Sequence, residues 1–306
     1  MVGGGFLGSH IAGALCAAGV RTTVLTRSTP SAGSAGARVL GARVVEGDAA
    51  DAAVFDDALT GCTQVVWCAG GLLPGESNAD PIGDVLLSLP AFLTGLEALR
   101  RRPGVHMTFF SSGGAVYGEP GKLPVAETHP LSPITSYAVM KVTAEHYLSV
   151  YRALYDVPSL VLRCANVYGE GQPGDRSQGV VAAVLDRVRV GEPVPLFGDG
   201  TAMRDFVHID DVVPVVLGLA GRRDTPPVVN VGSGTGTKLA DLLGLVAEVT
   251  GATVQIERHP ARAGDVHSVV LDIGLLRSLL RFEPLPLRAG LSRTWSALSE
   301  AALTSP

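Results

Sequence analysis

The chain has 306 residues, of which 46% are hydrophobic and 17% are charged, so it can bury a large core. Its formal net charge of −5 argues against a nucleic-acid-binding surface or an anionic-membrane surface. The N-terminal residues are apolar, but they lack the basic start of a signal peptide, and no uninterrupted apolar stretch is long enough to span a bilayer. We therefore expect a cytoplasmic protein with no nucleic-acid partner and no membrane partner.

The cysteines are spread along the chain without the spacing of a zinc site or the density of a disulfide framework. They are Cys16, Cys62, Cys68 and Cys164. We expect them to be small buried residues in a reducing compartment, and we expect no metal site.

Short β-branched segments alternate with longer helical patterns through the first two-thirds of the chain. The expected strands are 22–25, 43–45, 64–67, 106–110 and 159–162, and the clearest expected helices are 82–102 and 137–155. This alternation predicts an α/β fold with a doubly wound parallel sheet of the Rossmann type. After residue 169, Gly- and Pro-rich connections separate shorter elements, which indicates a smaller C-terminal lobe.

Residues 3–8 read Gly-Gly-Gly-Phe-Leu-Gly, which fits the pattern G-x-G-x-x-G, and a helical pattern follows directly. In such a loop the glycines let the backbone approach a pyrophosphate, whose charge the helix N-terminus stabilises. The loop residues that we expect to bind a dinucleotide are Gly3, Gly5, Phe6, Leu7 and Gly8. We therefore expect a dinucleotide-binding Rossmann domain over 1–168. Residues 169–306 should be mainly a substrate-binding lobe, with some segments returning to the first domain.

Only Met1 and Val2 precede this loop, although a strand is expected there. That strand is central in a doubly wound sheet, so its absence would leave a gap between neighbours with unpaired backbone groups. We expect the first strand to be truncated and the natural chain to begin several residues upstream of Met1. A sheet that is intact without such a strand would contradict this expectation.

The end of the strand after the loop bears on the choice of cofactor. An acidic residue there would bind the adenosine ribose, but this chain has Thr26 and Arg27. Arg27 could neutralise a 2′-phosphate, which favours NADP, or it could be a solvated loop arginine, which leaves NAD equally open. Asp48 lies where a carboxylate could accept a hydrogen bond from the adenine amino group, although a turn aspartate would look the same.

Tyr137 and Lys141 lie four residues apart at the start of a predicted helix, so both side chains fall on one face. A tyrosine ordinarily ionises near pH ~10, and a nearby cation helps it to lose its proton at neutral pH. Lys141 supplies such a charge and could also hold the nicotinamide ribose. The spacing Y-x-x-x-K is common by chance in surface helices, but here it follows a dinucleotide loop. We therefore expect a catalytic, proton-handling pair that also contacts the cofactor.

Longer segments then follow in a distinctive order. They are Ser111–Gly118, Arg163–Gly169, Phe197–Val207, Asp210–Val212, Asn230–Gly234 and Arg262–Val266. With the glycine loop and the tyrosine–lysine pair, they resemble the extended short-chain dehydrogenases/reductases, the NAD-dependent epimerase/dehydratase family that acts on nucleotide sugars. The resemblance covers nearly the whole chain and is strongest to bacterial UDP-galactose (UDP-glucose) 4-epimerases.

This resemblance implies a substrate site for a UDP- or dTDP-linked hexose. Asn166 would touch the diphosphate, and Arg204 and Arg262 would clamp the phosphates, which guanidinium groups bind bidentately. The other implied substrate contacts are Val181, Leu196 and Phe197 around the base, together with Gly113 and Asp265. The other implied cofactor contacts are Ala49, Ala69, Gly70, Ser111 and Cys164.

Two positions depart from the family pattern. The usual catalytic hydroxyl lies four residues before the tyrosine of V-Y-G, where this chain has Gly113, so Ser112 would have to reach into the site. In the glycine loop, the commoner family spacing G-x-x-G-x-x-G would place its first glycine at Val2.

The resemblance implies transient oxidation of the sugar at C4 by bound NAD and return of the hydride to the opposite face, which is 4-epimerisation. A dehydratase is disfavoured, because related dehydratases carry Asp-Glu before V-Y-G and this chain has Gly114 and Ala115. The main alternative is an NADPH-dependent 4-keto-sugar reductase of deoxysugar biosynthesis, which Arg27 favours. A non-catalytic NAD(P)-sensing protein is a third hypothesis, against which the intact tyrosine–lysine pair argues. The helices 82–102 and 137–155 resemble those that pair across a two-fold axis in this family, so we expect a homodimer.

Overall fold

The computed structural model describes residues 1–28, 41–174, 179–262 and 264–304. The chain forms two compact units. Unit 1 comprises Met1–Ser112, Thr135–Arg163 and Val213–Val229, and unit 2 comprises Gly113–Ile134, Cys164–Val212 and Asn230–Pro306. The sequence places one main boundary after residue 168 with later segments returning, whereas in the structure the chain passes between the units several times.

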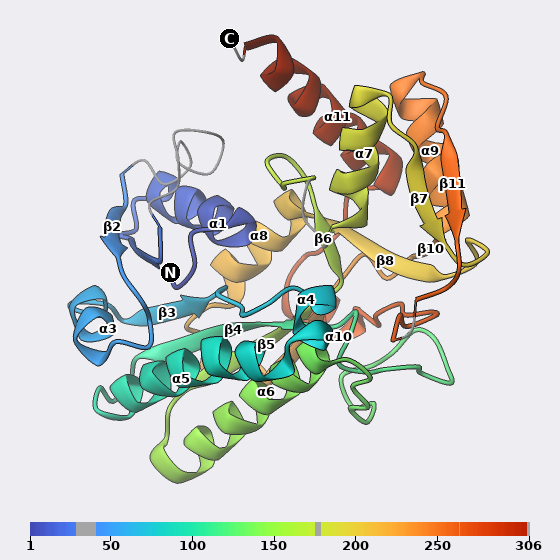
Figure 1. Cartoon of the computed structure of the whole chain (residues 1–306). Coiled ribbons are helices and arrows are strands. Elements are labelled where there is room, and N and C mark those ends of the chain that lie inside the picture. The colour runs from blue at the N-terminus through green and yellow to red at the C-terminus, as the bar shows by residue number, and fades with distance from the viewer. Residues whose placement is uncertain (29–40, 175–178, 263, 305–306) are drawn as a thin grey trace. The chain divides into compact units, whose positions relative to one another are not determined.

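The parallel sheet expected from the sequence is confirmed (Figure 1). Its strands are β1 (Thr23–Thr26), β2 (Arg43–Glu46), β3 (Gln64–Trp67), β4 (His106–Ser112), β5 (Ser159–Cys164) and β9 (Val228–Val231). β1 pairs with β2 in parallel, and the remaining strands follow in the order β3-β4-β5-β9. β4 and β5 are buried along almost their whole length, as expected for parallel strands covered on both faces.

Two long helices of unit 1, α5 (Pro81–Arg100) and α6 (Ser136–Tyr155), lie side by side (Figure 1). The Asp80 side chain caps α5 by accepting from the Gly83 N–H, and the Thr135 side chain caps α6 by accepting from the Ala138 N–H. These caps fix where both helices begin. The shorter helices of this unit are α1 (Phe6–Ala17), α3 (Ala52–Ala58) and α4 (Pro74–Ala79).

Helix α5 is more apolar than expected, because the sequence predicts no apolar stretch long enough to span a bilayer. Among the helices that the structure describes, α5 is long and apolar enough to cross a membrane by length and composition. Its inward face, however, places Phe92, Leu96 and Leu99 in the hydrophobic core of unit 1, each at most 3% exposed. The core helix of a globular unit meets the same criterion, so packing of the inward face accounts for part of the apolar composition of α5.

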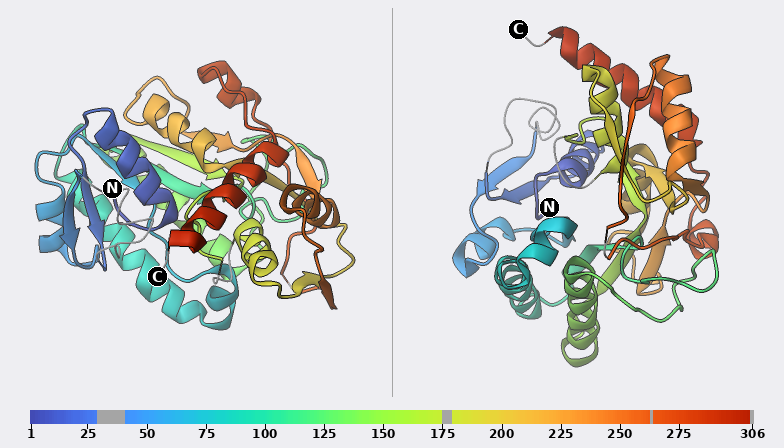
Figure 2. Two further views of the ribbon diagram at one scale, coloured as in Figure 1. Left: turned by 90° about the horizontal axis from the view of Figure 1, so that it is seen from above. Right: turned by 45° about the vertical axis from the view of Figure 1, so that its right-hand side comes forward.

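Unit 2 contains two small sheets and a layer of helices. β8 (Met203–His208) lies between β6 (Asn166–Tyr168) and β10 (Gly236–Lys238), and β7 (Val194–Phe197) pairs with β11 (Ile256–His259). Its helices α7 (Val180–Val190), α9 (Leu239–Thr250) and α11 (Leu287–Thr304) pack together around one apolar core (Figure 2). The other helices are α10 (Gly274–Leu279) and α8 (Ile209–Leu219), which continues from unit 2 into unit 1.

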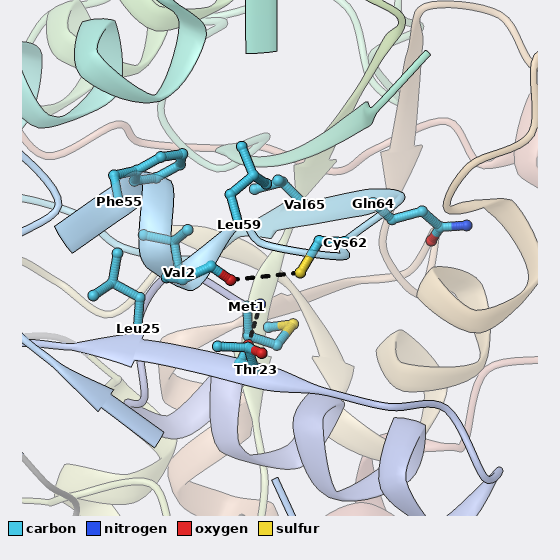
Figure 3. A pocket seen from close by; sticks show the side chains of 10 residues that line it. Met1, Val2, Thr23, Leu25, Phe55, Leu59, Cys62, Gln64 and Val65 are labelled. Atoms are coloured by element: carbon cyan, nitrogen blue, oxygen red, sulfur yellow. Dashed lines mark hydrogen bonds between the residues drawn. The ribbon is translucent and has the colours of Figure 1, made fainter. Parts of the chain in front are cut away.

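The place of a central strand between β1 and β3 is held by Val2. This residue forms isolated parallel bridges to Leu25 and Trp67, and its N–H donates to the Val66 carbonyl at 2.9 Å. Beside Met1 lies a pocket of about 280 Å³, counting its open mouth (Figure 3). It is lined by Met1, Val2, Thr23, Leu25, Phe55, Ala58, Leu59, Cys62, Gln64 and Val65. Val2 therefore links β1 and β3 by isolated bridges, and the longer first strand expected from the sequence stays a prediction.

The Met1 ammonium group occupies a position that suits a peptide N–H. It donates to the Thr23 carbonyl at 2.7 Å, and burial lowers its pKa. Between that lowered pKa and ~8, the unfolded chain binds more protons than the folded chain. The free energy of unfolding should therefore rise with pH across this window.

We predict that an N-terminal extension of four alternating valine and isoleucine residues will stabilise unit 1. The extension should fill the pocket between β1 and β3 and raise the free energy of unfolding by about 2 kcal/mol, or a few degrees in Tm. Thermal unfolding followed by circular dichroism measures this. A four-residue Gly-Ser extension is the matched control: both extensions should abolish the rise of stability with pH, but only the apolar one should raise Tm. Equal Tm values for the two extended chains would contradict the prediction.

Candidate active site

The glycine loop is shaped by contacts that leave no room for side chains. Gly3 has φ +98°, and a Cβ there would lie 2.8 Å from the Ala69 nitrogen. A Cβ at Gly8 would lie 1.9 Å from the Gly3 carbonyl oxygen. At Gly5, in contrast, nothing lies within 4 Å, and α1 begins at the next residue. The loop therefore packs tightly on one side and offers open space with helical N–H groups on the other, which fits the diphosphate of a dinucleotide.

The expected ribose and adenine residues follow β1 and β2. Thr26 pairs in register with Glu46, and its hydroxyl donates to the Ser28 carbonyl at 3.0 Å. The Arg27 side chain is exposed at the end of β1. Asp48 is also exposed, and its carboxylate accepts from the Ala50 N–H at 2.8 Å. Arg27 is therefore accessible to a phosphate. One carboxylate oxygen of Asp48 is used in a local turn, and the neighbouring Ala49 is buried.

Tyr137 and Lys141 lie in the first two turns of α6 and are both half-buried. The Lys141 ammonium donates to the Phe110 carbonyl of β4 at 2.8 Å. It lies 5.7 Å from the centroid of the Tyr137 ring and 5.0 Å from that of the Phe109 ring. The structure therefore brings the predicted pair together and fixes the cation beside the phenol.

The catalytic pair borders a pocket that is built wholly from unit 1. The pocket measures about 510 Å³, counting its open mouth. Its walls include Ala69 and Gly70, which follow β3, as well as Phe109 and residues of α5 and α6. The predicted cofactor residues after β3 thus share a pocket with the predicted catalytic residues.

Asp84 is a residue of this pocket that the sequence analysis missed. Only 1% of it is exposed, and its carboxylate accepts from the Leu72 N–H and from the hydroxyls of Ser77 and Ser88. These bonds attach the loop after β3 to α5. An acidic residue in the otherwise apolar first half of this helical segment is the signal that could have identified it.

The three residues around the end of β4, Ser111, Ser112 and Gly113, differ in burial and in hydrogen bonding. The Ser111 hydroxyl is buried and donates to Glu145, whereas Ser112 is half-buried at the last position of the strand. Gly113 is buried in unit 2, and its N–H donates to the Cys164 carbonyl at 2.7 Å. Of the two serines, Ser112 is therefore the one whose hydroxyl is not committed to Glu145.

Cys68 lies directly after β3, close to the glycine loop. Burial raises the pKa of its thiol to about 12, although the Lys141 charge acts in the opposite direction. A thiol with this pKa remains protonated at neutral pH and is a poor nucleophile. Cys68 is therefore not a candidate nucleophile for this site.

In unit 2, the expected phosphate-binding residues are organised by β6 and β8. Asn166 donates to the Asp205 carbonyl at 3.0 Å, and Arg204 donates through Nη1 to the carbonyls of Met203 and His267. Burial lowers the pKa of Arg204, while the charge of Asp265 raises it. An arginine always remains charged in proteins, so Arg204 presents a fixed, partly desolvated cation.

Arg262 and Phe197 form a stacked pair in unit 2. The Arg262 guanidinium carbon lies 3.4 Å from the centroid of the Phe197 ring, and the other partner of that ring is His259. Val181 and Leu196, in contrast, are 1% and 4% exposed and belong to the core of this unit. Their expected place beside a base stays a prediction.

We predict that Gly5→Ala and Gly8→Ala will separate cofactor binding from folding. At Gly5 an added methyl meets no protein atom, so the Tm should stay within a few degrees while NAD affinity falls about tenfold or more. At Gly8 the methyl collides with a backbone carbonyl, so the Tm itself should fall. Isothermal titration with NAD and thermal unfolding measure the two effects. Unchanged NAD affinity in Gly5→Ala would show that the diphosphate does not approach this loop.

Comparisons with known proteins agree with this geometry. The NAD dependent epimerase/dehydratase family model matches residues 1–232. The UDP-glucose 4-epimerase of Mycolicibacterium smegmatis is 36% identical over 222 residues, covering 72% of this chain and 68% of the relative. A dTDP-6-deoxy-L-talose 4-dehydrogenase (NAD(P)(+)) of Kitasatospora kifunensis is 33% identical over 98% of this chain and 94% of its own.

Solved structures agree as well. The complex of Thermus thermophilus UDP-glucose 4-epimerase with NAD superimposes with a TM-score of 0.88 and 32% identity, covering 98% of each chain. The residues of the glycine loop and of the adjacent pocket thus fit NAD. The chain belongs to the NAD-dependent epimerase/dehydratase family of extended short-chain dehydrogenases/reductases.

Proposed function

We propose that this chain is a nucleotide-sugar 4-epimerase that works with bound NAD on a UDP-linked or dTDP-linked hexose. The observation that carries the proposal is the Tyr137–Lys141 pair. Its cation is fixed to the Phe110 carbonyl, and the pair shares a pocket with the loop after β3. The similarity to the Mycolicibacterium smegmatis and Thermus thermophilus enzymes supports the same conclusion.

In this proposal Tyr137 is the general base. Its phenolate takes the proton from the sugar 4-hydroxyl as a hydride leaves C4, which gives a 4-keto sugar. The nicotinamide ring of bound NAD supplies the hydride acceptor and later the donor. Once the keto sugar has rotated, protonated Tyr137 would give its proton back to the 4-oxygen, so that reduction on the opposite face of C4 completes the epimerisation.

Lys141 and the unit 2 arginines have separate tasks in this reaction. The Lys141 ammonium stabilises the negative charge on the Tyr137 oxygen, because opposite charges at short range favour the ionised form. Arg204 and Arg262 bind the diphosphate by charge-assisted hydrogen bonds, which keep the nucleotide bound while the hexose turns.

A second candidate function is NAD(P)-dependent 4-keto-sugar reduction or its reverse. The Kitasatospora kifunensis relative is a 4-dehydrogenase, and the exposed Arg27 at the end of β1 offers a cation to a 2′-phosphate. Such an enzyme uses the same tyrosine–lysine pair, but it consumes one cofactor for each sugar. The two functions therefore differ in cofactor stoichiometry.

We predict that the purified protein will interconvert UDP-glucose and UDP-galactose without added cofactor. Tyr137→Phe removes only the ionisable hydroxyl and should lower kcat at least about 100-fold with little change in Tm. Chromatography of the nucleotide sugars measures the interconversion. Stoichiometric oxidation of NADPH with a nucleotide-linked 4-keto sugar, without interconversion, would instead establish the reductase. Full activity of Tyr137→Phe on every nucleotide sugar tested would contradict both enzymes.

We also propose that the protein is a homodimer that pairs through α5 and α6. Exposed apolar residues recur on the outer faces of both helices at helical spacing. They are Ile82, Val85 and Leu86 on α5, and Val139, Val150 and Leu154 on α6. Two adjacent helices with such faces can pack on a second copy as a four-helix bundle. We further propose a cytoplasmic location, which the wide spacing of the cysteines along the sequence favours.

We predict that Leu86→Asp and Leu154→Asp, which place a charge on this face, will each shift the protein from dimer to monomer. Light scattering at micromolar concentration measures the mass. Val190→Asp is the control, because Val190 is 51% exposed on α7 in unit 2 and should not affect assembly. A monomeric wild-type protein, or equal loss of dimer in the control, would overturn the proposal.

A further inference from the structure

Glu145 continues the face of α6 that carries the catalytic pair. Tyr137, Lys141 and Glu145 follow at intervals of four residues, so they lie one above the other on the helix. Glu145 is only 7% exposed, although it carries a carboxylate. A buried charge is costly unless it is paired and hydrogen-bonded, so its partners indicate why it is there.

The partners of Glu145 come from two neighbouring strands of the sheet. The Ser111 hydroxyl of β4 donates to Oε1, and this serine is 5% exposed. Arg163 of β5, also 5% exposed, donates from Nε to the carboxylate at 3.1 and 3.2 Å and from Nη2 to Oε2 at 2.6 Å. The planar guanidinium thus holds the planar carboxylate in one orientation.

Two bonds therefore connect α6 to consecutive residues of β4. Lys141 donates to the carbonyl of Phe110, and the next residue, Ser111, donates to Glu145. One helical turn rises about 5.4 Å, whereas one strand residue advances about 3.3 Å. A slide or rotation of α6 along β4 cannot preserve both bonds, and it would also break the bonds to Arg163. The ion pair therefore sets the register of α6 on the sheet.

We propose that Glu145, held by Ser111 and Arg163, is a positioning residue that fixes the Lys141 ammonium beside Tyr137. Its catalytic consequence rests on the proposed function, because Lys141 acts on the reaction through the tyrosine and through the cofactor that it is expected to contact. The positional consequence does not depend on any substrate, so it can be tested by itself.

The position of Lys141 can be measured by NMR, because the chain has only three lysines, Lys122, Lys141 and Lys238. In protein labelled with ¹³C-lysine, the Lys141 side-chain signal should be displaced by the rings of Phe109 and Tyr137, and Lys141→Arg assigns it. Glu145→Gln and Arg163→Met should move this signal toward the other two lysines. If the signal keeps its position in both variants, the proposal is wrong, whether or not the protein is an epimerase.

Arg152 provides a matched control on the same helix. It also connects α6 to β5, by donating to the carbonyl and hydroxyl of Ser159 at 3.0 and 2.9 Å, but it does so at the far end of the helix. Arg152→Met should lower the Tm without moving the Lys141 signal. A shift as large as that of Arg163→Met would show that any weakening of α6 has this effect and would overturn the proposal.

Turnover tests the catalytic consequence. Glu145→Gln and Arg163→Met should lower kcat for UDP-glucose about tenfold or more and leave KM within about twofold, because the diphosphate residues are unchanged. The double variant Glu145→Met/Arg163→Met removes both charges and should recover much of the lost Tm, as apolar replacements of buried ion pairs often do. It should keep the low kcat. Recovery of kcat together with Tm would reduce the pair to a stabilising role and overturn the proposal. A wild-type protein inactive on every nucleotide sugar would refute only the proposed function.

Discussion

Parallel strands end at the same edge of a sheet, and this constraint determines where the site of unit 1 lies. The carboxyl ends of β1, β3 and β4 all lie at that edge. The glycine loop begins there too, directly after Val2. The loops that follow these strands begin side by side, because the pairing of parallel strands aligns the strand ends. Short loops are therefore enough to bring their residues together. Strand direction therefore determines where the pocket beside Tyr137 lies, and the side chains determine what it can bind.

Buried carboxylates then hold the surrounding segments in place. In unit 1, Asp84 accepts from one backbone N–H and two hydroxyls, and Glu145 is paired with Arg163. In unit 2, Asp205 accepts from the N–H groups of Ser233, Gly234 and Leu271. Burial raises the pKa of Asp205, and the accepted hydrogen bonds oppose that change. Each acid is costly to bury, but each connects several chain segments by hydrogen bonds.

The sequence was informative where structure is local. The strands β1 to β5 and the helices α5 and α6 were predicted within a few residues, because β-branched runs and helical periodicity are properties of short segments. The Tyr137–Lys141 pair was predictable because four residues of helix place two side chains on one face.

Features that depend on tertiary packing were not predictable. Glu145 and Arg163 are 18 residues apart, and Asp205 and Leu271 are 66 apart, so nothing local couples them. Val181 and Leu196 are apolar, and apolar side chains can equally line a base pocket or fill a core, so the sequence alone does not distinguish the two. The longer strand expected between β1 and β3 rests on the general need of a parallel sheet for paired neighbours, and it stays a prediction.

The proposed reaction requires a base that stays fixed while a sugar turns. The bonds of Lys141 to the Phe110 carbonyl and of Glu145 to Arg163 supply the fixed part, because α6 cannot slide on the sheet while they persist. The hexose can rotate only if the protein binds it less firmly than it binds the nucleotide. The positively charged contacts predicted in unit 2, Arg204 and Arg262, suit phosphates, which a hexose lacks. An anchor of this kind fixes the nucleotide and leaves rotation about the bonds between phosphate and sugar. A reductase could bind the diphosphate in the same way. The two enzymes therefore differ in whether the hydride returns to the sugar, and not in how the diphosphate is bound.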